Sequence, residues 1–411
     1  MPTREYRDMS YKQRVLLVNK FYYPRGGDCI QMMGVERLLR QHGHEVAVFS
    51  MQYPENNPTE YSRYFPEKVD FSGGVKARLA AAARIFGYGG VKEQFEKLLR
   101  DFTPDVVHLH NIHSYISPVV AEIAKKHKIP VVWTLHDYKP ACPAYSCLSG
   151  GKPCEKCFSD KTNVLRYRCM KASMAASIMA YLEAEVWNIK RLCRSTDTFI
   201  CPSRFMRQAM IRAGIPSDKL EVLNNFINET EDAPMLQSIV PGEKREEYYC
   251  YVGRLSEEKG VSTLIKAAAM LPYKIKIIGT GPLYDYLIKK YQTPNIEFLG
   301  FQEHAETLRL LSKARFSVMP SECYENNPLG VIESLCVGTP VVGSDIGGIP
   351  ELINKTNGKL FTPFHPDSLR QTIEAVHNDT RFDYAKIAEE AQIRFSSGTY
   401  YKKIIEIYDR K

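Results

Sequence analysis

The chain has 411 residues, 44% of them hydrophobic and 25% charged, which suits two globular domains rather than one. It holds no apolar run long enough to span a membrane, and its polar N-terminus lacks a signal-peptide core, so we expect a cytoplasmic protein. Residues 1–235 carry 33 Lys and Arg against 25 Asp and Glu, whereas residues 236–411 carry 22 of each. The basic first half fits phosphorylated ligands or an anionic membrane surface, and it also fits scattered surface charge.

Short β-branched runs alternate with helical patterns along the whole chain. The predicted strands are 14–19, 45–50, 105–109, 130–134, 198–201 and 220–223 in the first half, and 249–252, 274–278, 296–299, 315–319 and 340–344 in the second. Helical patterns lie between them, for example 28–41, 117–127, 259–271 and 366–376. This alternation predicts an α/β protein with two doubly wound, Rossmann-like domains that face each other across a cleft.

A turn-rich acidic stretch separates the two halves of the chain. It predicts a first domain over 1–228, a linker over 229–244 and a second domain over 245–395. The amphipathic pattern in 396–411 predicts a C-terminal helix that returns to the first domain. Since open parallel sheets bind ligands outside the carboxyl ends of their strands, motifs that directly follow strands are the candidates for function.

Two carboxylates follow the predicted strand 315–319. Glu325 lies in the loop before a predicted helix, and Glu333 lies more than one turn inside that helix. Free backbone N–H groups at the helix start bind phosphate, and carboxylates accept hydrogen bonds from hydroxyls, so a sugar nucleotide suits the pair. A solvated loop glutamate and a surface glutamate explain the spacing equally well. The predicted N-cap and first turn are Asn327, Pro328, Leu329 and Gly330.

Two cations follow the predicted strand 249–252. Gly253 permits a tight exit from the strand, and Arg254 and Lys259 come next. Arginine binds phosphate with two hydrogen bonds and lysine acts as a point charge, so the pair suits a diphosphate. Without further support, solvated surface cations are the more frequent explanation of such residues.

These segments together resemble the retaining family-4 glycosyltransferases of the GT-B fold. The motifs that carry the resemblance are Gly-Arg-Leu-x-x-x-Lys-Gly at 253–260, the two glutamates Glu325 and Glu333, and Gly-x-Pro-Val at 338–341, all in the family's order. The resemblance implies transfer of a sugar from a nucleotide-sugar donor to a saccharide or lipid-linked acceptor in surface polysaccharide synthesis, with no cofactor needed for catalysis. One departure is the hinge, where the family often has Asn-Gly-Val-Asp and this chain has Asn225-Phe-Ile-Asn228.

The resemblance also implies roles for single residues of the second half. Arg254 and Lys259 would stabilise the departing diphosphate. Glu325 would hold hydroxyls of the transferred sugar, and Glu333 would bind the ribose. The remaining donor-side residues would be Gly281, Phe301 in the base-binding segment 300–303, Asn327, Pro328, Leu329 and Gly330.

In the first half, the adjacent Gly26 and Gly27 resemble the family's glycine-rich loop, although a plain loop is the simpler explanation of two glycines. His136, in Thr134-Leu-His136, resembles the active-site histidine that contacts the donor sugar or the acceptor. The other strand-end side chains on the acceptor side are His110, Asn111 and Asp137.

Five cysteines crowd the segment after His136. Cys142, Cys154, Cys157 and Cys169 have a spacing that predicts a structural zinc site, whereas independent reduced thiols are the alternative. The fifth is Cys147.

Basic residues flank the segment 170–187, which suits an acceptor at the inner face of an anionic membrane. The Ala- and Met-rich segment itself is predicted to be a core helix rather than a membrane-lying one. The other functions considered are a sugar-nucleotide epimerase of the same fold and a non-catalytic nucleotide-sugar-binding scaffold. A dehydrogenase would need a third glycine after Gly279-Thr-Gly281, and no nucleic-acid-binding motif occurs.

Overall fold

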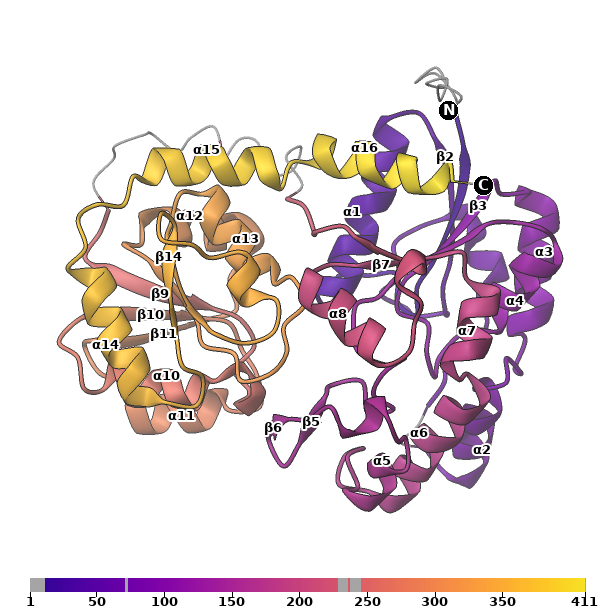
Figure 1. Cartoon of the computed structure of the whole chain (residues 1–411), viewed down its shortest axis with the longest axis horizontal. Coiled ribbons are helices and arrows are strands. Elements are labelled where there is room, and N and C mark those ends of the chain that lie inside the picture. Colours follow the sequence, from indigo (N-terminus) through magenta and orange to yellow (C-terminus); the bar gives the residue numbers. More distant parts are fainter. Residues whose placement is uncertain (1–11, 71–72, 228–235, 237–244, 411) are drawn as a thin grey trace.

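The computed structural model describes residues 12–70, 73–227, 236 and 245–410. It contains two parallel six-stranded sheets, each covered by helices and placed side by side (Figure 1). The predicted fold class of two Rossmann-like domains is therefore confirmed. Within the described residues, no helix has the length and apolar character that crossing a bilayer requires.

The first sheet has the strand order β2-β1-β3-β4-β7-β8. Its strands are β1 (Arg14–Val18), β2 (Glu45–Phe49), β3 (Val106–Leu109), β4 (Val131–Thr134), β7 (Thr198–Cys201) and β8 (Leu220–Val222). The helices of this half are α1 (Gly27–Gln41), α2 (Val75–Arg84), α3 (Val91–Phe102), α4 (Val119–Lys126), α5 (Asn163–Arg166), α6 (Met174–Val186), α7 (Ile189–Ser195) and α8 (Arg204–Arg212). The chain order reverses between β1 and β3, which opens a crevice at their carboxyl ends.

The second sheet has the order β11-β10-β9-β12-β13-β14, with the same kind of reversal between β9 and β12. Its strands are β9 (Tyr248–Val252), β10 (Lys274–Ile278), β11 (Ile296–Gly300), β12 (Ser317–Met319), β13 (Val341–Ser344) and β14 (Gly358–Phe361). Its helices are α10 (Val261–Ala268), α11 (Tyr284–Tyr291), α12 (His304–Lys313), α13 (Leu329–Cys336), α14 (Pro366–His377) and α15 (Tyr384–Arg394). Strand β14 was not predicted, nor was the short hairpin of β5 (Leu148–Ser149) and β6 (Lys152–Pro153).

Two predictions at helix starts were wrong. The helix predicted from Lys259 begins at Val261, because Gly260 takes a left-handed conformation with φ of 68° and ends the 3₁₀ turn Glu257–Lys259. Asn327 does not cap α13, since Pro328 occupies the N-cap position. The Asn327 side chain instead accepts a hydrogen bond from the backbone N–H of Asn225, 2.7 Å away.

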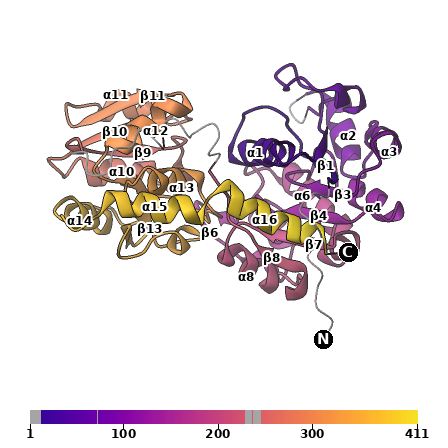
Figure 2. The ribbon, with the colours of Figure 1, turned by 90° about the horizontal axis from the view of Figure 1, so that it is seen from above.

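Helix α16 (Ser397–Tyr408) follows α15 and lies along the first domain (Figures 1 and 2). Its buried residues Tyr400, Ile404 and Tyr408 pack into the core of the first domain. The Tyr408 hydroxyl shares a 2.7 Å hydrogen bond with His108 of β3. The predicted linker 229–244 lies outside the described residues apart from Leu236.

Candidate active site

The centre of the candidate site is the start of α13, at the carboxyl ends of β9 and β12. A Cβ atom added to Gly330 would lie 3.4 Å from Met319 at the end of β12 and 3.8 Å from the carbonyl oxygen of Val252 at the end of β9. A Cβ added to Gly260 would lie only 1.8 Å from the carbonyl oxygen of Pro320, so only glycine fits there. The turn after β9 is thus pressed against the loop after β12.

An ion pair joins these two segments. The Lys259 ammonium donates to a Glu325 carboxylate oxygen at 2.5 Å, and the Ser321 hydroxyl donates to the same oxygen at 2.8 Å. Burial alone would lower the pKa of Lys259, but the Glu325 carboxylate outweighs burial and raises it. The lysine is therefore fully charged at neutral pH. The Gly348 N–H donates to the Glu325 carbonyl oxygen at 2.6 Å and fixes the backbone of this loop.

The ends of β9, β10 and β11 form a continuous edge beside α13. The N–H of Gly253 donates to Ile278 at 3.0 Å, and the N–H of Gly279 donates to Gly300 at 2.7 Å. A Cβ on Gly279 would lie 2.1 Å from the carbonyl oxygen of Gly253, and a Cβ on Gly281 would lie 2.4 Å from that of Leu255. These glycines are therefore required by backbone contacts between neighbouring strand ends.

Three predicted donor-side residues lie on or beside this edge. Phe301 follows β11 and is 68% exposed, which leaves an aromatic face open to a planar ligand. Arg254 is exposed at the end of β9, and Glu333 is half-buried in the second turn of α13. Lys259 and Glu325 are in direct contact, so the sequence correctly placed these two motifs next to each other.

The first domain meets this loop directly. The Asn326 amide donates to the carbonyl oxygen of His136 at 2.6 Å, and the Asn225 amide donates to the carbonyl oxygen of Asn327 at 2.8 Å. A Cβ placed on Gly27 would lie 3.9 Å from the Leu329 side chain, so the glycine loop faces the start of α13. Residues that the sequence assigned to opposite walls of a cleft are thus brought together.

Two histidines at the strand ends of the first domain, His110 and His136, are bonded to each other. His110 and His136 share a 2.9 Å hydrogen bond between ring nitrogens. Burial lowers the pKa of His136 to about 4, against the opposing attraction of Asp28. Burial also lowers the pKa of His110 well below its usual range. Both imidazoles are therefore neutral at neutral pH, and they can orient a hydroxyl without adding positive charge.

A charged group that the sequence analysis missed lies beside these histidines. Lys20 follows β1 and acts electrostatically on Asp28, His136 and Asp137. Burial raises the pKa of Asp28, but electrostatic interactions with His136 and Lys20 and a 2.9 Å hydrogen bond from Asn111 leave it lowered. The position of Lys20 at the end of a strand was the signal that could have identified it.

Asp137 belongs to a loop that a buried ion pair holds in place. Burial raises the pKa of Asp137, whose carboxylate accepts the N–H of Lys139 at 2.9 Å. The Lys139 ammonium in turn lies 2.8 Å from the carboxylate of Glu183, and both side chains are buried. Glu183 also accepts the N–H and the hydroxyl of Ser114, each at 2.7 Å. Helix α6 therefore anchors two strand-end loops of the first domain.

A second contact between the domains was also missed. The Glu351 carboxylate accepts the N–H groups of Arg204 at 2.8 Å and Phe205 at 2.5 Å, at the start of α8. A carboxylate at a helix N-terminus is favourable because it satisfies free N–H groups. The ring of Tyr324, next to Glu325, packs against Phe205 and Tyr138 with centroids 4.8 and 6.0 Å away. These contacts fix the Glu325 loop against the first domain.

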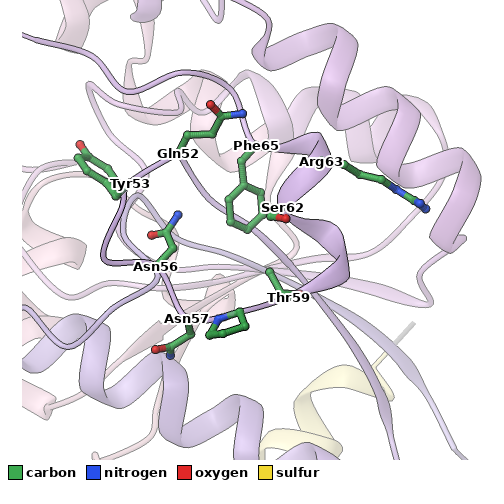
Figure 3. A pocket seen from close by; sticks show the side chains of 9 residues that line it. Gln52, Tyr53, Asn56, Asn57, Thr59, Ser62, Arg63 and Phe65 are labelled. Atoms are coloured by element: carbon green, nitrogen blue, oxygen red, sulfur yellow. The ribbon is translucent and has the colours of Figure 1, made fainter.

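An open pocket of about 550 Å³ lies after β2 (Figure 3). Its lining includes the amides of Gln52, Asn56 and Asn57 and the ring of Tyr53. The buried Asn56 Oδ1 has no hydrogen-bond partner in the described part of the chain.

Tyr53 connects this pocket to the strand ends of the first domain. The Phe21 ring lies 5.2 Å from Tyr53 and 5.7 Å from both Tyr23 and Tyr115. The Lys20 ammonium lies over the rings of Phe21 and Tyr115. A cluster of aromatic rings thus leads from the Lys20 region to the pocket.

The cysteine segment brings three of its five thiols together. Hydrogen bonds from the thiols of Cys147 and Cys157 lower the pKa of Cys142, so these three cysteines lie together. Cys154 instead has a backbone hydrogen bond to Cys147, and the Cys169 thiol bonds to Ser149. Among the residues that the structure describes, no group of three or more His, Cys, Asp or Glu is arranged to hold a metal ion. Structural zinc stays a prediction.

The site combines a cation–carboxylate pair, the start of a helix and a glycine loop, and it lies between two Rossmann-like domains. This combination is typical of a GT-B glycosyltransferase. Comparison with known proteins gives the same class. The family described as Glycosyltransferase Family 4 matches residues 32–231, and Glycosyl transferases group 1 matches residues 237–394. Together the matches cover both domains, and the chain belongs to the family-4 glycosyltransferases of the GT-B fold.

Individual relatives agree with this assignment. An uncharacterised glycosyltransferase of Methanocaldococcus jannaschii is 26% identical over 393 residues, which is 90% of either chain. The amylovoran biosynthesis glycosyltransferase AmsK of Erwinia amylovora is 28% identical over 196 residues, 44% of this chain and 47% of that one. The Anabaena protein HepE, solved in complex with UDP and glucose, superimposes with a TM-score of 0.61 at 20% identity and covers 97% of this chain and 100% of its own.

Proposed function

We propose that this glycosyltransferase transfers a sugar, with retention of anomeric configuration, from a uridine diphosphate sugar to a saccharide acceptor of a surface polysaccharide. The observation that carries the proposal is the Lys259–Glu325 ion pair, whose loop continues into Asn326 and Leu329, the residues that meet His136 and Gly27 of the other domain. A cation, a carboxylate that accepts hydrogen bonds from hydroxyls, and a helix N-terminus thus lie close together. The UDP-bound relative and the polysaccharide role in the name of the Erwinia relative support the choice of donor and product.

The donor would lie along the strand ends of the second domain. The base would stack on the exposed ring of Phe301, and Glu333 would accept hydrogen bonds from the ribose hydroxyls. The diphosphate would bind the free N–H groups of Leu329 and Gly330 at the start of α13. Arg254 and Lys259 would balance the negative charge that develops as the diphosphate leaves.

The chemistry of retention needs no enzyme nucleophile in this arrangement. The bond between the anomeric carbon and the phosphate oxygen breaks while the acceptor oxygen attacks from the same face. The departing phosphate oxygen takes the proton of the acceptor hydroxyl, which balances the step. Glu325 is held by Lys259 and Ser321, so it would orient hydroxyls of the transferred sugar rather than attack it. The neutral His136 would donate or accept one further hydrogen bond to the sugar.

The acceptor would bind on the first domain. Tyr23, Tyr53 and Tyr115 offer ring faces, and the pocket with Asn56 offers amide groups for hydroxyls (Figure 3). Aromatic faces with a few amides are the lining that a saccharide needs, because a sugar has both apolar C–H faces and hydroxyls. We propose that this saccharide is lipid-linked and that the enzyme works at the cytoplasmic face of a membrane.

Nucleotide binding tests the donor half of the proposal. UDP should raise the Tm more than GDP, ADP or CMP, because a ligand that binds only the folded chain stabilises it.

The Lys259→Met variant should lose about 100- to 1,000-fold in kcat for UDP-sugar turnover, as expected when one charge-stabilising group is removed. Lys274→Met is the matched control, since Lys274 forms a 3.1 Å ion pair with Glu297 elsewhere on the same sheet. Equal rates in the two variants, or no Tm shift with any nucleotide, would refute the proposal. An altered free sugar nucleotide without transfer would indicate the epimerase instead.

A further inference from the structure

Helix α6 exposes an apolar stripe to solvent. Met174, Ile178 and Leu182 are 42%, 43% and 45% exposed and follow each other at intervals of four residues, which places them on one face of the helix. The opposite face buries Ser177, Ala180 and the anchoring Glu183. The prediction of a core helix over this segment was therefore wrong for one of its faces.

Helix α2, which lies beside α6, exposes further apolar side chains. Both views place α2 beside α6 (Figures 1 and 2). The Trp187 indole at the end of α6 donates to the carbonyl oxygen of Ile85 at the end of α2, over 2.7 Å. Leu79 of α2 and Tyr88 just after it are 66% and 60% exposed. We call the surface of these exposed side chains the α2–α6 face; it consists of Leu79, Phe86, Tyr88, Met174, Ile178 and Leu182.

Cations border the α2–α6 face. Arg166, Arg168 and Lys171 are exposed in the turn that leads into α6, and Lys76 is exposed on α2. On α6 itself Glu185 is exposed, and its carboxylate is hydrogen-bonded to Tyr181. The border is thus mainly positive beside the start of α6.

We propose that the α2–α6 face docks the enzyme on the surface of an anionic lipid bilayer. An amphipathic helix with Met, Ile and Leu on one side and basic residues beside it lies in the interface of a membrane, where its apolar side chains enter the acyl boundary. The cations select anionic headgroups by charge complementarity. Three apolar residues exposed on successive turns of one helix face call for a partner, whereas single exposed apolar residues do not. The inference rests on the proposed function only in that a lipid-linked acceptor would lie in this bilayer.

Vesicle sedimentation tests the docking directly. The full chain should bind vesicles of phosphatidylglycerol mixed with phosphatidylcholine much more tightly than vesicles of phosphatidylcholine alone. Raising the salt concentration should weaken the binding, because exposed charges are screened. Neither measurement needs a donor, an acceptor or turnover.

Two variants separate the apolar and the charged contributions. Ile178→Gln with Leu182→Gln removes apolar contact, and Arg166→Gln with Arg168→Gln and Lys171→Gln removes charge; each should weaken binding to anionic vesicles by about tenfold or more. The matched apolar control is Met270→Gln with Ile393→Gln, which are 50% and 67% exposed on the other domain. The matched charge control is Lys355→Gln with Lys402→Gln and Lys403→Gln, all exposed and far along the chain from α6.

Three results would overturn the docking proposal. The first is an absence of binding to anionic vesicles at low salt, and the second is an equal loss of binding in the variants and their controls. The third is a stable dimer in sedimentation velocity that Ile178→Gln with Leu182→Gln dissociates, which would make a second copy the partner. Failure of the proposed function would look different, because vesicle binding would persist while UDP failed to raise the Tm.

Discussion

The two walls of the candidate active site, one from each domain, are built by different means. In the second domain, glycines let backbone segments meet at distances that exclude any Cβ, and one ion pair, Lys259–Glu325, joins the two motifs. In the first domain, titratable side chains of separate elements meet, as in the pair His110–His136 after β3 and β4 and in the pair Lys139–Glu183 between a loop and α6. The second wall is therefore encoded in short motifs, whereas the first wall depends on the packing of the whole domain.

The largest effect should come from the buried ion pair of the first domain. Lys139→Met leaves the Glu183 carboxylate buried without its cation, which should lower the free energy of unfolding by about 3–5 kcal/mol. Urea denaturation at neutral pH measures the change. Adding Glu183→Gln should restore part of the loss, because a neutral amide still accepts hydrogen bonds from Ser114.

The control for this prediction is an exposed pair of the second domain. Lys386 and Glu390 lie 4.0 Å apart on α15, and both are well exposed. Lys386→Met should change the free energy of unfolding by about 0.5 kcal/mol or less. If Lys139→Met cost no more than Lys386→Met, the first wall would not depend on its buried charges.

The same contrast explains what the sequence could predict. Most of the predicted strands occur at or near their expected positions, because β-branched runs and helical periodicity are local signals. Glu325 and Lys259 were found together because each follows a strand whose end lies at the reversal point of the sheet. The glycines at 260, 279 and 281 carried a local signal as well, since each permits a close backbone approach.

Contacts between distant segments could not be read from the sequence. Hydrophobic periodicity predicts that a residue is buried but does not identify its partner, so the Glu183 contact to Lys139 and the Glu351 contact to α8 were missed. Asn327 was assigned to a helix cap on local grounds, yet its side chain bonds to Asn225, which lies 102 residues away along the chain. Local preference was outweighed there by a contact between domains.

Two glycine-to-alanine substitutions test how close backbone contacts build the second wall. In Gly348→Ala, the new Cβ would lie 1.7 Å from the carbonyl oxygen of Asn326, so the loop that holds Glu325 must shift. We expect a loss of about 2–3 kcal/mol in the free energy of unfolding, together with a loss of turnover. Gly27→Ala has room for its Cβ, since the nearest atom is 3.9 Å away, and should change stability by less than about 1 kcal/mol.

Gly27→Ala nonetheless should raise the KM for the donor by about tenfold, because the backbone of a glycine loop approaches phosphate oxygens closely. Tm and KM measured on both variants separate the two roles of glycine. A Gly27→Ala enzyme with normal donor affinity would show that this loop does not contact the diphosphate.

Counted for each residue, the smallest expected effect is the acid sensitivity of the buried histidines in the first domain. Burial lowers the pKa of His108 and His113 to about 3 and that of His136 to about 4. Unfolded histidines take up protons near their usual pKa of about 6.5, so the unfolded state binds more protons below that pH. Stability should therefore fall as the pH falls from about 6.5 to about 5, by about 1–2 kcal/mol for each buried histidine. Carboxylates of ordinary pKa contribute little over this range, because they titrate at lower pH. Asp137, whose pKa burial raises, acts in the opposite direction.

His113→Phe isolates one of these contributions. The His113 ring stacks on Trp133 with centroids 5.0 Å apart, and neither of its nitrogens has a hydrogen-bond partner in the described part of the chain. Phenylalanine keeps the stacking and cannot be protonated. In the variant, the free energy of unfolding should therefore fall less steeply with falling pH, by the contribution of one proton. Urea midpoints between pH 5 and pH 7 measure that slope, and His127→Gln, at the exposed end of α4, controls for the removal of a histidine elsewhere. An unchanged slope in His113→Phe would mean that this imidazole is already solvated in the folded chain, and the buried wall of the first domain would then be more open than its packing indicates.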